Sequence, residues 1–247
     1  MSVSPVIAEG TYAEDLHLAW HHSRLPFDHL DDAGALPDSV AHSEVLHNFV
    51  KPPIHGWAFG HLRRLLPRAL TLDELEQAYQ RLARWTVFWL DHRRVPGHDL
   101  PHYQHGNDSG WDNATTFDGE RLLETADLAA FLTLQLCEPV RPAGELGDDD
   151  AAAQWDRTAV NIRAALMASL WDGSRFGARS ATTGRCGSSS SLLGLMPVTL
   201  GPVQACATAP TPGPPTATSS SAQPTRPAGS RVDASQVIAS LVLPERN

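Results

Sequence analysis

The sequence lacks the features by which membrane and nucleic-acid-binding proteins are usually recognised. It contains no apolar run of about 18 residues, the length that a helix needs to span a bilayer. Residues 1–10 lack the basic start and apolar block of a signal peptide. The net charge is −9 and no basic stripe is visible. We therefore expect no membrane partner and no nucleic-acid partner for this chain of 247 residues.

Cysteine is scarce, and the three residues are odd in number and widely spaced: Cys137, Cys186 and Cys206. This pattern gives neither the ligand spacing of a metal site nor a disulfide framework. We therefore expect no metal, no cofactor and no disulfide bond, in a reduced, cytoplasmic setting. In that setting the sequons at Asn107 and Asn113 would carry no glycan.

Aromatic residues are absent after Phe176, although 17 aromatic residues occur up to and including it. Residues 201–247 contain 8 of the 19 prolines and are rich in alanine, serine and threonine. Such a composition cannot bury enough apolar surface to offset the loss of chain entropy. We expect a domain over residues 1–200 and a disordered tail over residues 201–247. We also hypothesise that the native reading frame or gene ends near residue 200, which translation of the other two frames would test.

Helical periodicity is the main pattern in the rest of the chain. Apolar residues recur at spacings of three and four, and strand-like alternation is almost absent. The predicted helices cover residues 11–27, 54–66, 71–94, 119–138 and 148–171, with one more over 188–200. Successive antiparallel helices with short links predict an all-α domain, and their lengths suit an α/α toroid with chemistry on the loops.

Several helix starts carry a recognisable cap. Thr71 and Glu74 form a capping box, and Asp118 is the predicted cap of the helix over 119–138. The acidic residues 148–150 lie at the next helix start, where the macrodipole favours them, so we prefer capping to a metal site. The clearest helix places six residues on one face: Leu75, Tyr79, Leu82, Trp85, Thr86 and Trp89.

The most polar stretch lies between two of these helices, at residues 105–117, HGNDSGWDNATTF. Gly106 and Gly110 allow sharp turns, and the Asn, Asp and Ser residues favour turns and caps over continued helix. We therefore predict a loop in which an indole covers the apolar face of a sugar ring while carboxylates and amides meet its hydroxyls. The candidate sugar contacts in this loop are His105, Asn107, Asp108, Trp111 and Asn113.

Cleavage of a glycosidic bond needs two carboxyl groups, of which one protonates the leaving oxygen. Asp112 is the candidate acid, because the adjacent indole of Trp111 raises a carboxyl pKa and keeps the proton available. Asp108 lies close by on the same loop, so we favour contact with a substrate hydroxyl or shaping of the loop for it. The stretch is also a good turn in which Asp112 could cap backbone amides.

Two metal interpretations are weaker. The residues here do not keep the ligand spacing of a calcium loop, and no glutamate occupies its last ligand position. His102 and His105 form a pair without a third ligand. The histidines near the N-terminus also lack a supporting acidic pattern and are better explained as exposed helix residues: His17, His21 and His22.

Residues 105–117 resemble the signature of glycoside hydrolase family 63 and the related mannosylglycerate hydrolase-like domains, whose bacterial members are often described as amylo-alpha-1,6-glucosidase or glycogen-debranching-like. Residues 51–57, KPPIHGW, resemble a second family segment, and residues 170–173, LWDG, followed by Phe176, a third. The resemblance spans about residues 30–200. It implies an (α/α)6 barrel, an inverting mechanism and an α-linked sugar substrate.

The resemblance also implies roles for individual residues. It places the general acid on Asp112 and lines the sugar subsite with residues of the same loop. Pro53 and Trp57 would help to shape that pocket. The family's general base is a glutamate far downstream, whereas the only glutamate after residue 145 here is Glu245, in the predicted tail.

The chain therefore resembles about half of a catalytic domain, since six or seven helices are predicted where a closed barrel of this type needs twelve. An open toroid exposes an apolar edge, which favours self-association or a partner. We expect a domain for an α-linked glucoside or small glycoside, weak or inactive because the second carboxylate is missing. The alternatives are a non-catalytic sugar-binding fragment and an all-α structural or interaction module. A polysaccharide lyase would need a basic or tyrosine centre, and none is identified.

Overall fold

The computed structural model describes residues 15–111, 113–187, 191–201 and 206. The α-helices are α2 (Leu16–Arg24), α3 (His55–Leu65), α4 (Leu72–Asp91), α5 (Ala126–Cys137), α6 (Val140–Glu145) and α7 (Asp149–Leu170). The 3₁₀ helices are η1 (Leu25–His29), η2 (Gly106–Ser109), η3 (Thr115–Phe117) and η4 (Leu192–Leu200). The strands are β1 (Ser39–Val40), β2 (Val45–Leu46), β3 (Leu123–Thr125), β4 (Ala178–Ser180) and β5 (Cys186–Gly187).

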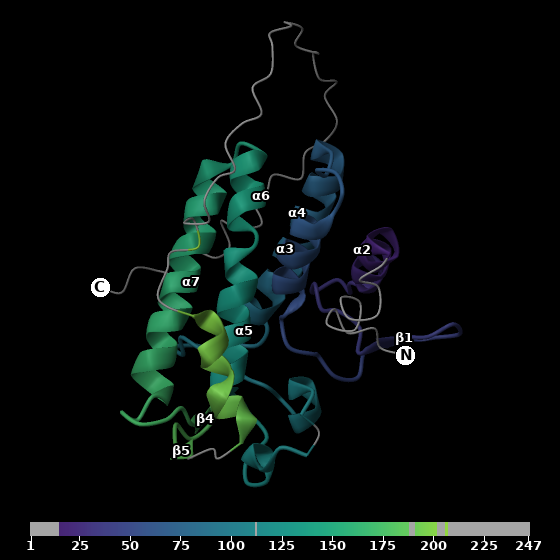
Figure 1. The fold of residues 1–247 in the computed structure, drawn as a ribbon. Coiled ribbons are helices and arrows are strands. Elements are labelled where there is room, and N and C mark those ends of the chain that lie inside the picture. Colours follow the sequence, from purple (N-terminus) through teal and green to yellow (C-terminus); the bar gives the residue numbers. More distant parts are fainter. Residues whose placement is uncertain (1–14, 112, 188–190, 202–205, 207–247) are drawn as a thin grey trace, which may run out of the picture.

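The long helices α4, α5 and α7 lie side by side (Figure 1). The strands β4 and β5 lie at one end of this helical layer, and α6 lies at the other end. β1 pairs with β2, and β3, β4 and β5 form a second small antiparallel sheet in that order. The described part of the chain is therefore mainly helical, as predicted, and its strands are short.

Helices α4 and α7 begin where the sequence predicts. Glu74 N donates to the Thr71 hydroxyl at 3.2 Å, and Thr71 N donates to a Glu74 carboxylate oxygen at 2.9 Å. This capping box satisfies N–H groups that have no partner within the helix. At the start of α7, Ala151 N donates to Asp148 Oδ1 at 2.9 Å, so capping by this acidic run is confirmed. The predicted face of α4 is buried in full: Leu75, Tyr79, Leu82, Trp85, Thr86 and Trp89.

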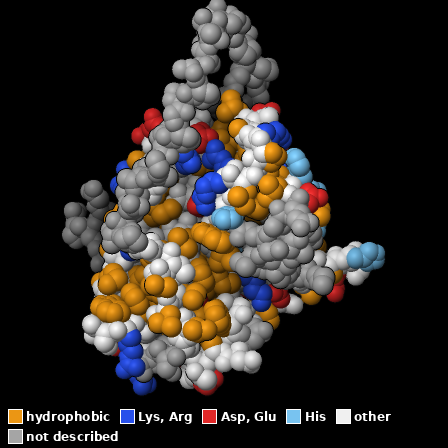
Figure 2. All heavy atoms as spheres, in the orientation of Figure 1, with side chains coloured by type: hydrophobic (Ala, Val, Ile, Leu, Met, Phe, Trp, Pro, Cys, Tyr) orange, Lys and Arg blue, Asp and Glu red, His pale blue; other side chains and the backbone are white. Residues whose placement is uncertain are grey.

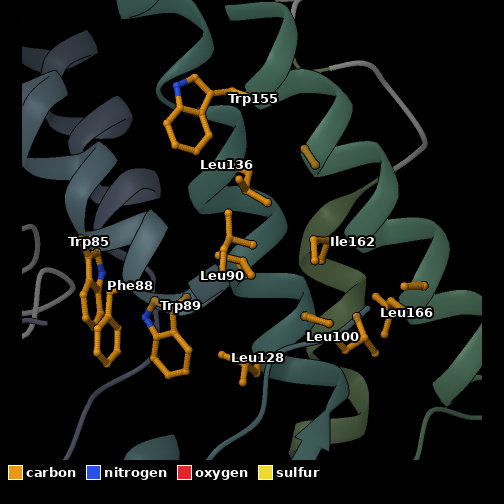
Figure 3. Packing of buried hydrophobic residues seen from close by; sticks show 14 of the residues in the cluster. Trp85, Phe88, Trp89, Leu90, Leu100, Leu128, Leu136, Trp155, Ile162 and Leu166 are labelled. Atoms are coloured by element: carbon orange, nitrogen blue, oxygen red, sulfur yellow. The ribbon is translucent and has the colours of Figure 1, made fainter. Parts of the chain in front are cut away.

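The main core lies between α4, α5 and α7 (Figure 3). Trp85 and Trp89 are completely buried there, and their ring centroids are 5.7 Å apart. Trp155 of α7 donates its Nε1 hydrogen to the Tyr79 hydroxyl at 3.1 Å, so this buried polar atom has a partner. The predicted face of α7 is buried as well: Trp155, Ala159, Ile162, Leu166 and Leu170.

Two glycines allow α3 to lie close against α5. A Cβ atom at Gly56 would lie 2.8 Å from Gln135 Oε1, and one at Gly60 would collide with the carboxylate of Glu138. Gly56 N donates to Gln135 Oε1 at 2.5 Å. Burial raises the pKa of Glu138 to about 7. The two glycines therefore let the segment that carries Trp57 pack closely on α5, where a larger side chain would not fit.

The predicted helix over 119–138 was wrong in its first part, because α5 begins at Ala126. Residues 123–125 instead form β3, in which Leu123 lies opposite Ser180 of β4. Leu123 also pairs with Tyr103, with N···O distances of 2.9 and 3.1 Å. Asp118 ends η3 and does not cap α5. Local periodicity misses this strand because its partner lies far along the chain.

The predictions for the chain ends are met in part. The connection over residues 139–147 contains the short helix α6. The last predicted helix is present over 192–200 as 3₁₀ turns, while residues 188–190 lie outside the described part. Residues 11–14 and nearly all of the predicted tail also lie outside it. Disorder of the tail, and the domain boundary at residue 200, therefore stay predictions.

The prediction that no disulfide forms was wrong. Cys137, at the end of α5, is joined to Cys206 across a separation of 69 residues, and Cys186 is free and exposed. Sequence spacing could not show that the chain returns to α5. The predicted cytoplasmic setting rested partly on that absence and stays a prediction. Among the described helices, none is long and apolar enough to cross a membrane.

Candidate active site

The predicted loop is present and is built from two short helices. His105 is extended, and its Nδ1 accepts a hydrogen bond from Asn107 N at 3.1 Å, which caps η2. The helix ends at Gly110, which has φ of 73°, a left-handed conformation that favours glycine. Gly106, by contrast, packs against Phe117 without a positive φ. The turn-forming composition therefore predicted the loop correctly, and Gly110 is the glycine that its backbone requires.

Asp108 is the centre of the loop. It is 2% exposed, and its Oδ2 accepts from Arg93 Nη1 at 3.0 Å and from the backbone N–H groups of Gln104 and His105 at 2.8 and 3.2 Å. Its Oδ1 accepts from Val50 N at 3.2 Å. Both carboxylate oxygens are thus occupied within the chain. Of the two roles considered from sequence, this geometry favours shaping of the loop over contact with a substrate hydroxyl.

Arg93 fixes the loop to the end of α4. Its guanidinium lies 5.5 Å from the ring centroid of Phe88 and 5.8 Å from that of Trp89. These aromatic faces stabilise the cation, and the Asp108 carboxylate neutralises it. The Arg93 carbonyl also accepts from His102 N at 2.7 Å. Arg93 therefore holds the loop against the end of α4.

The second family-like segment contacts the same loop. Lys51 Nζ donates to the carbonyl of Asn107 at 3.1 Å. Just before the segment, the ring of Phe49 lies against that of His105, with centroids 5.0 Å apart and planes tilted by 30°. Lys51 also pairs with Asp38 at 3.2 Å. Pro53, two residues after Lys51, is buried. Two stretches more than 50 residues apart in the sequence therefore meet at this loop.

The base of the loop is anchored on α5. The Tyr103 hydroxyl donates to Asp127 Oδ2 at 2.9 Å, and the ring of Tyr103 lies 6.0 Å from that of Phe117. Burial raises the pKa of Asp127 to about 6 and that of Tyr103 well above its usual value. Burial, followed by the charge of Arg93, lowers the pKa of His102. Tyr103, Asp127 and His102 are therefore buried, and burial disfavours the charged form of each.

The remaining candidates lie in two places. Trp111 is half-buried and Asn113 is exposed, so both lie at the surface of the loop. Trp57 lies in α3, where its indole stacks on His61 at 5.6 Å. Asp112 lies outside the described residues, so its role as acid stays a prediction. The loop therefore offers a half-buried indole and an exposed amide on a fixed base, an arrangement suited to a sugar ring.

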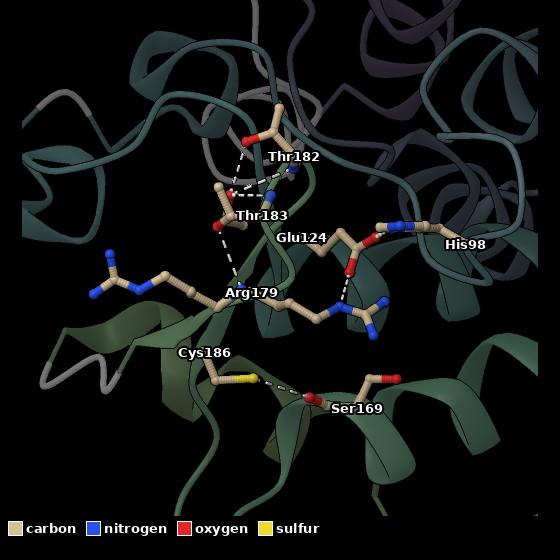
Figure 4. A network of polar contacts seen from close by, with 9 residues as sticks. His98, Glu124, Ser169, Arg179, Thr182, Thr183 and Cys186 are labelled. Carbon is tan, nitrogen blue, oxygen red and sulfur yellow. Dashed lines mark hydrogen bonds and ion pairs between the residues drawn. The ribbon is translucent and has the colours of Figure 1, made fainter.

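A buried ionic cluster beside the loop escaped sequence analysis. Glu124 of β3 is completely buried, accepts from Arg179 Nε and lies 2.5 Å from His98 Nδ1 (Figure 4). Arg93 was missed as well. Neither residue has a local signal in the sequence, because their partners lie 15 to 55 residues away along the chain. Within the parts of the chain that the structure describes, no group of three His, Cys, Asp or Glu side chains is arranged to hold a metal ion.

Comparison with known proteins decides the family. The model of the mannosylglycerate hydrolase MGH1-like glycoside hydrolase domain matches residues 4–210. The chain belongs to this family. The resemblance seen in the sequence is thereby confirmed. A search of curated proteins finds no match to this MGH1-like domain.

Solved structures similar to this MGH1-like domain come from Thermus thermophilus. A GH63 mannosylglycerate hydrolase in complex with glucose has 15% identity and a TM-score of 0.67, covering 78% of this chain and 64% of its own. The same enzyme in complex with Tris has 15% identity and a TM-score of 0.70, with coverages of 81% and 66%. An uncharacterized conserved protein has 17% identity and a TM-score of 0.69, with coverages of 81% and 64%.

These similarities establish the fold of the MGH1-like domain. The chain is an all-α, partial toroid, as predicted, and it spans 64 to 66% of the length of these structures.

Proposed function

We propose that the chain is a glycoside hydrolase-like domain that binds an α-linked glucoside or small glycoside at the loop over residues 105–113. The observation that carries this proposal is the fixed loop itself. Asp108 and Arg93 hold its backbone from inside, while Trp111 and Asn113 lie at its surface. A rigid support is what a sugar site needs, because loosely held side chains lose affinity through ordering.

The catalytic part of the proposal assigns the general acid to Asp112, which follows Trp111 in the sequence. An inverting reaction also needs a carboxylate base about 6.5–9.5 Å from the acid, to activate water on the opposite face of the sugar. Glu245, in the predicted tail, is the only glutamate beyond residue 145. We therefore propose that the domain binds its glycoside but hydrolyses it weakly or not at all.

The solved structures support the class of ligand. One similar hydrolase was crystallised with glucose, and another crystal of a GH63 mannosylglycerate hydrolase contained Tris and D-glycerate. Small polyhydroxyl molecules therefore occupy sites in proteins of this fold. We propose that class of ligand for this chain, and not the particular substrate.

The test combines hydrolysis and binding on the purified full chain. Release of p-nitrophenol from p-nitrophenyl α-glucoside should stay close to the enzyme-free blank. Glucose should nevertheless change the intrinsic tryptophan fluorescence, and Trp111→Ala should weaken that binding about tenfold by removing the aromatic platform. Trp171→Ala, which removes an exposed indole directly after α7, is the control.

Each outcome selects one of the candidate functions. Rapid hydrolysis that Asp112→Asn abolishes would mean that the domain is a working enzyme and that the missing-base proposal is wrong. Binding without hydrolysis supports the sugar-binding fragment. No response to any α-glucoside, with both tryptophan variants equal to wild type, supports an all-α interaction module.

A further inference from the structure

A cavity of about 280 Å³ lies beside the candidate loop, between η3 and the β4–β5 hairpin. This volume is close to the lower end of the roughly 300–1,000 Å³ found for small-molecule sites, and it suits one small ring. Two lining residues, Thr115 and Thr116, belong to the candidate loop, and Ala114 N just before them donates to the Trp111 carbonyl at 2.9 Å. The lining residues that matter here are Thr115, Thr116, Glu120, Leu123, Ser180 and Arg185.

The chemistry of this wall matches an uncharged, hydroxyl-rich ligand. Glu120 supplies a carboxylate and Arg185 a guanidinium, so the wall offers charges of both signs. A free anion would be repelled by the carboxylate and a free cation by the guanidinium. A sugar ring satisfies both, because its hydroxyls donate to a carboxylate and accept from a guanidinium. Leu123 and Ala178 add apolar surface for the C–H face of such a ring.

The carboxylate in this wall is held in place before any ligand arrives. Ser180 Oγ donates to Glu120 Oε2 at 2.8 Å, and Ser180 itself is 1% exposed. The Ser180 hydroxyl also accepts from Thr183 N at 3.1 Å, and Ser180 N donates to the carbonyl of Arg185 at 2.9 Å. Such support from buried neighbours lowers the entropy that a bound ligand must remove.

We propose that this cavity is a second sugar subsite, which binds the ring adjacent to the one held at Trp111, with Glu120 accepting hydrogen bonds from its hydroxyls. This inference rests on the proposed function, because it places two neighbouring rings of one glycoside along the loop. The domain thereby distinguishes a disaccharide from a single sugar.

Isothermal titration of the full chain tests this with methyl α-glucoside as the single ring and with maltose and isomaltose as disaccharides. At least one disaccharide should bind about tenfold more tightly than methyl α-glucoside, the value of one hydrogen bond to a charged group. Glu120→Gln should remove most of that advantage while leaving binding of the single ring unchanged. The amide keeps an acceptor for Ser180, so the fold should persist. Arg185→Gln should reduce the advantage independently.

Glu44→Gln, an exposed carboxylate between β1 and β2, is the matched control and should leave all affinities unchanged. If the single ring binds but neither disaccharide binds more tightly, the second subsite is refuted and the proposed function stands. The same holds if Glu120→Gln and Arg185→Gln both retain the full advantage. If none of the three sugars binds, the proposed function fails together with the subsite.

Discussion

At the residue scale, Asp108 shows how a polar loop can be organised from the inside. Its carboxylate accepts hydrogen bonds from the backbone of Val50, Gln104 and His105, and it pairs with Arg93. The ion pair is almost fully buried, with side chains 10% and 3% exposed for Arg93 and Asp108. Breaking such a pair leaves an uncompensated charge in the interior, which costs about 3–5 kcal/mol.

Asp108→Asn should therefore lower the free energy of unfolding by about 3 kcal/mol, because the amide cannot neutralise Arg93. It should also weaken sugar binding at Trp111 by releasing the loop. Urea denaturation and glucose titration measure the two effects. Asp32→Asn, an exposed carboxylate, should change stability by less than about 0.5 kcal/mol. Equal stabilities of the two variants would show that the buried pair does not support the loop.

At the scale of elements, the contact between the loop and α5 depends on a buried acid. Asp127 accepts from the Tyr103 hydroxyl, and burial raises its pKa to about 6 from an ordinary value of 3.8. The folded state therefore binds a proton more tightly than the unfolded state does. The resulting stability is present below about pH 4 and is lost as pH rises through 6, by about 3 kcal/mol at 1.36 kcal/mol per pKa unit.

Asp127→Asn removes this proton linkage and keeps an acceptor for Tyr103. The difference in unfolding free energy between the variant and wild type should therefore shift by about 2 kcal/mol in favour of the variant between pH 4 and pH 7. Denaturation curves at both pH values measure it, with Asp32→Asn, at an exposed carboxylate, as the control. A constant difference across this range would mean that Asp127 is ionised in the folded protein at low pH.

Elements that depend on local pattern were predictable from the sequence, and those that depend on distant partners were not. The capping box at Thr71 and the buried face of α4 follow from residues within a few turns of each other. β3 reads as the start of a helix, because its partner β4 lies far along the chain. The loop itself was recognisable by its composition. Its support by Arg93 and residues 49–51 was not, because those contacts arise only when distant segments meet.

At the scale of the whole molecule, the partial toroid exposes apolar side chains on α7 and η4. Figure 2 shows hydrophobic side chains gathered over the region where η4 lies. The exposed apolar residues of these two helices are Val160, Met167, Leu192, Leu195 and Val198, with exposures from 42% to 79%. The similar structures are longer, since this chain covers only 64 to 66% of them. A contiguous apolar surface of this kind favours association.

We predict that the full chain self-associates through this surface. Sedimentation velocity between about 1 and 100 μM should show a monomer that converts to dimer, because burying about 800 Å² on each partner is typical of a specific interface. Leu195→Lys combined with Val198→Lys should keep the chain monomeric over that range, since two buried charges would oppose the contact. Leu72→Lys, at an equally exposed apolar residue on the start of α4, should leave association unchanged. A wild-type chain that stays monomeric at about 100 μM would show that this edge does not bind a second copy.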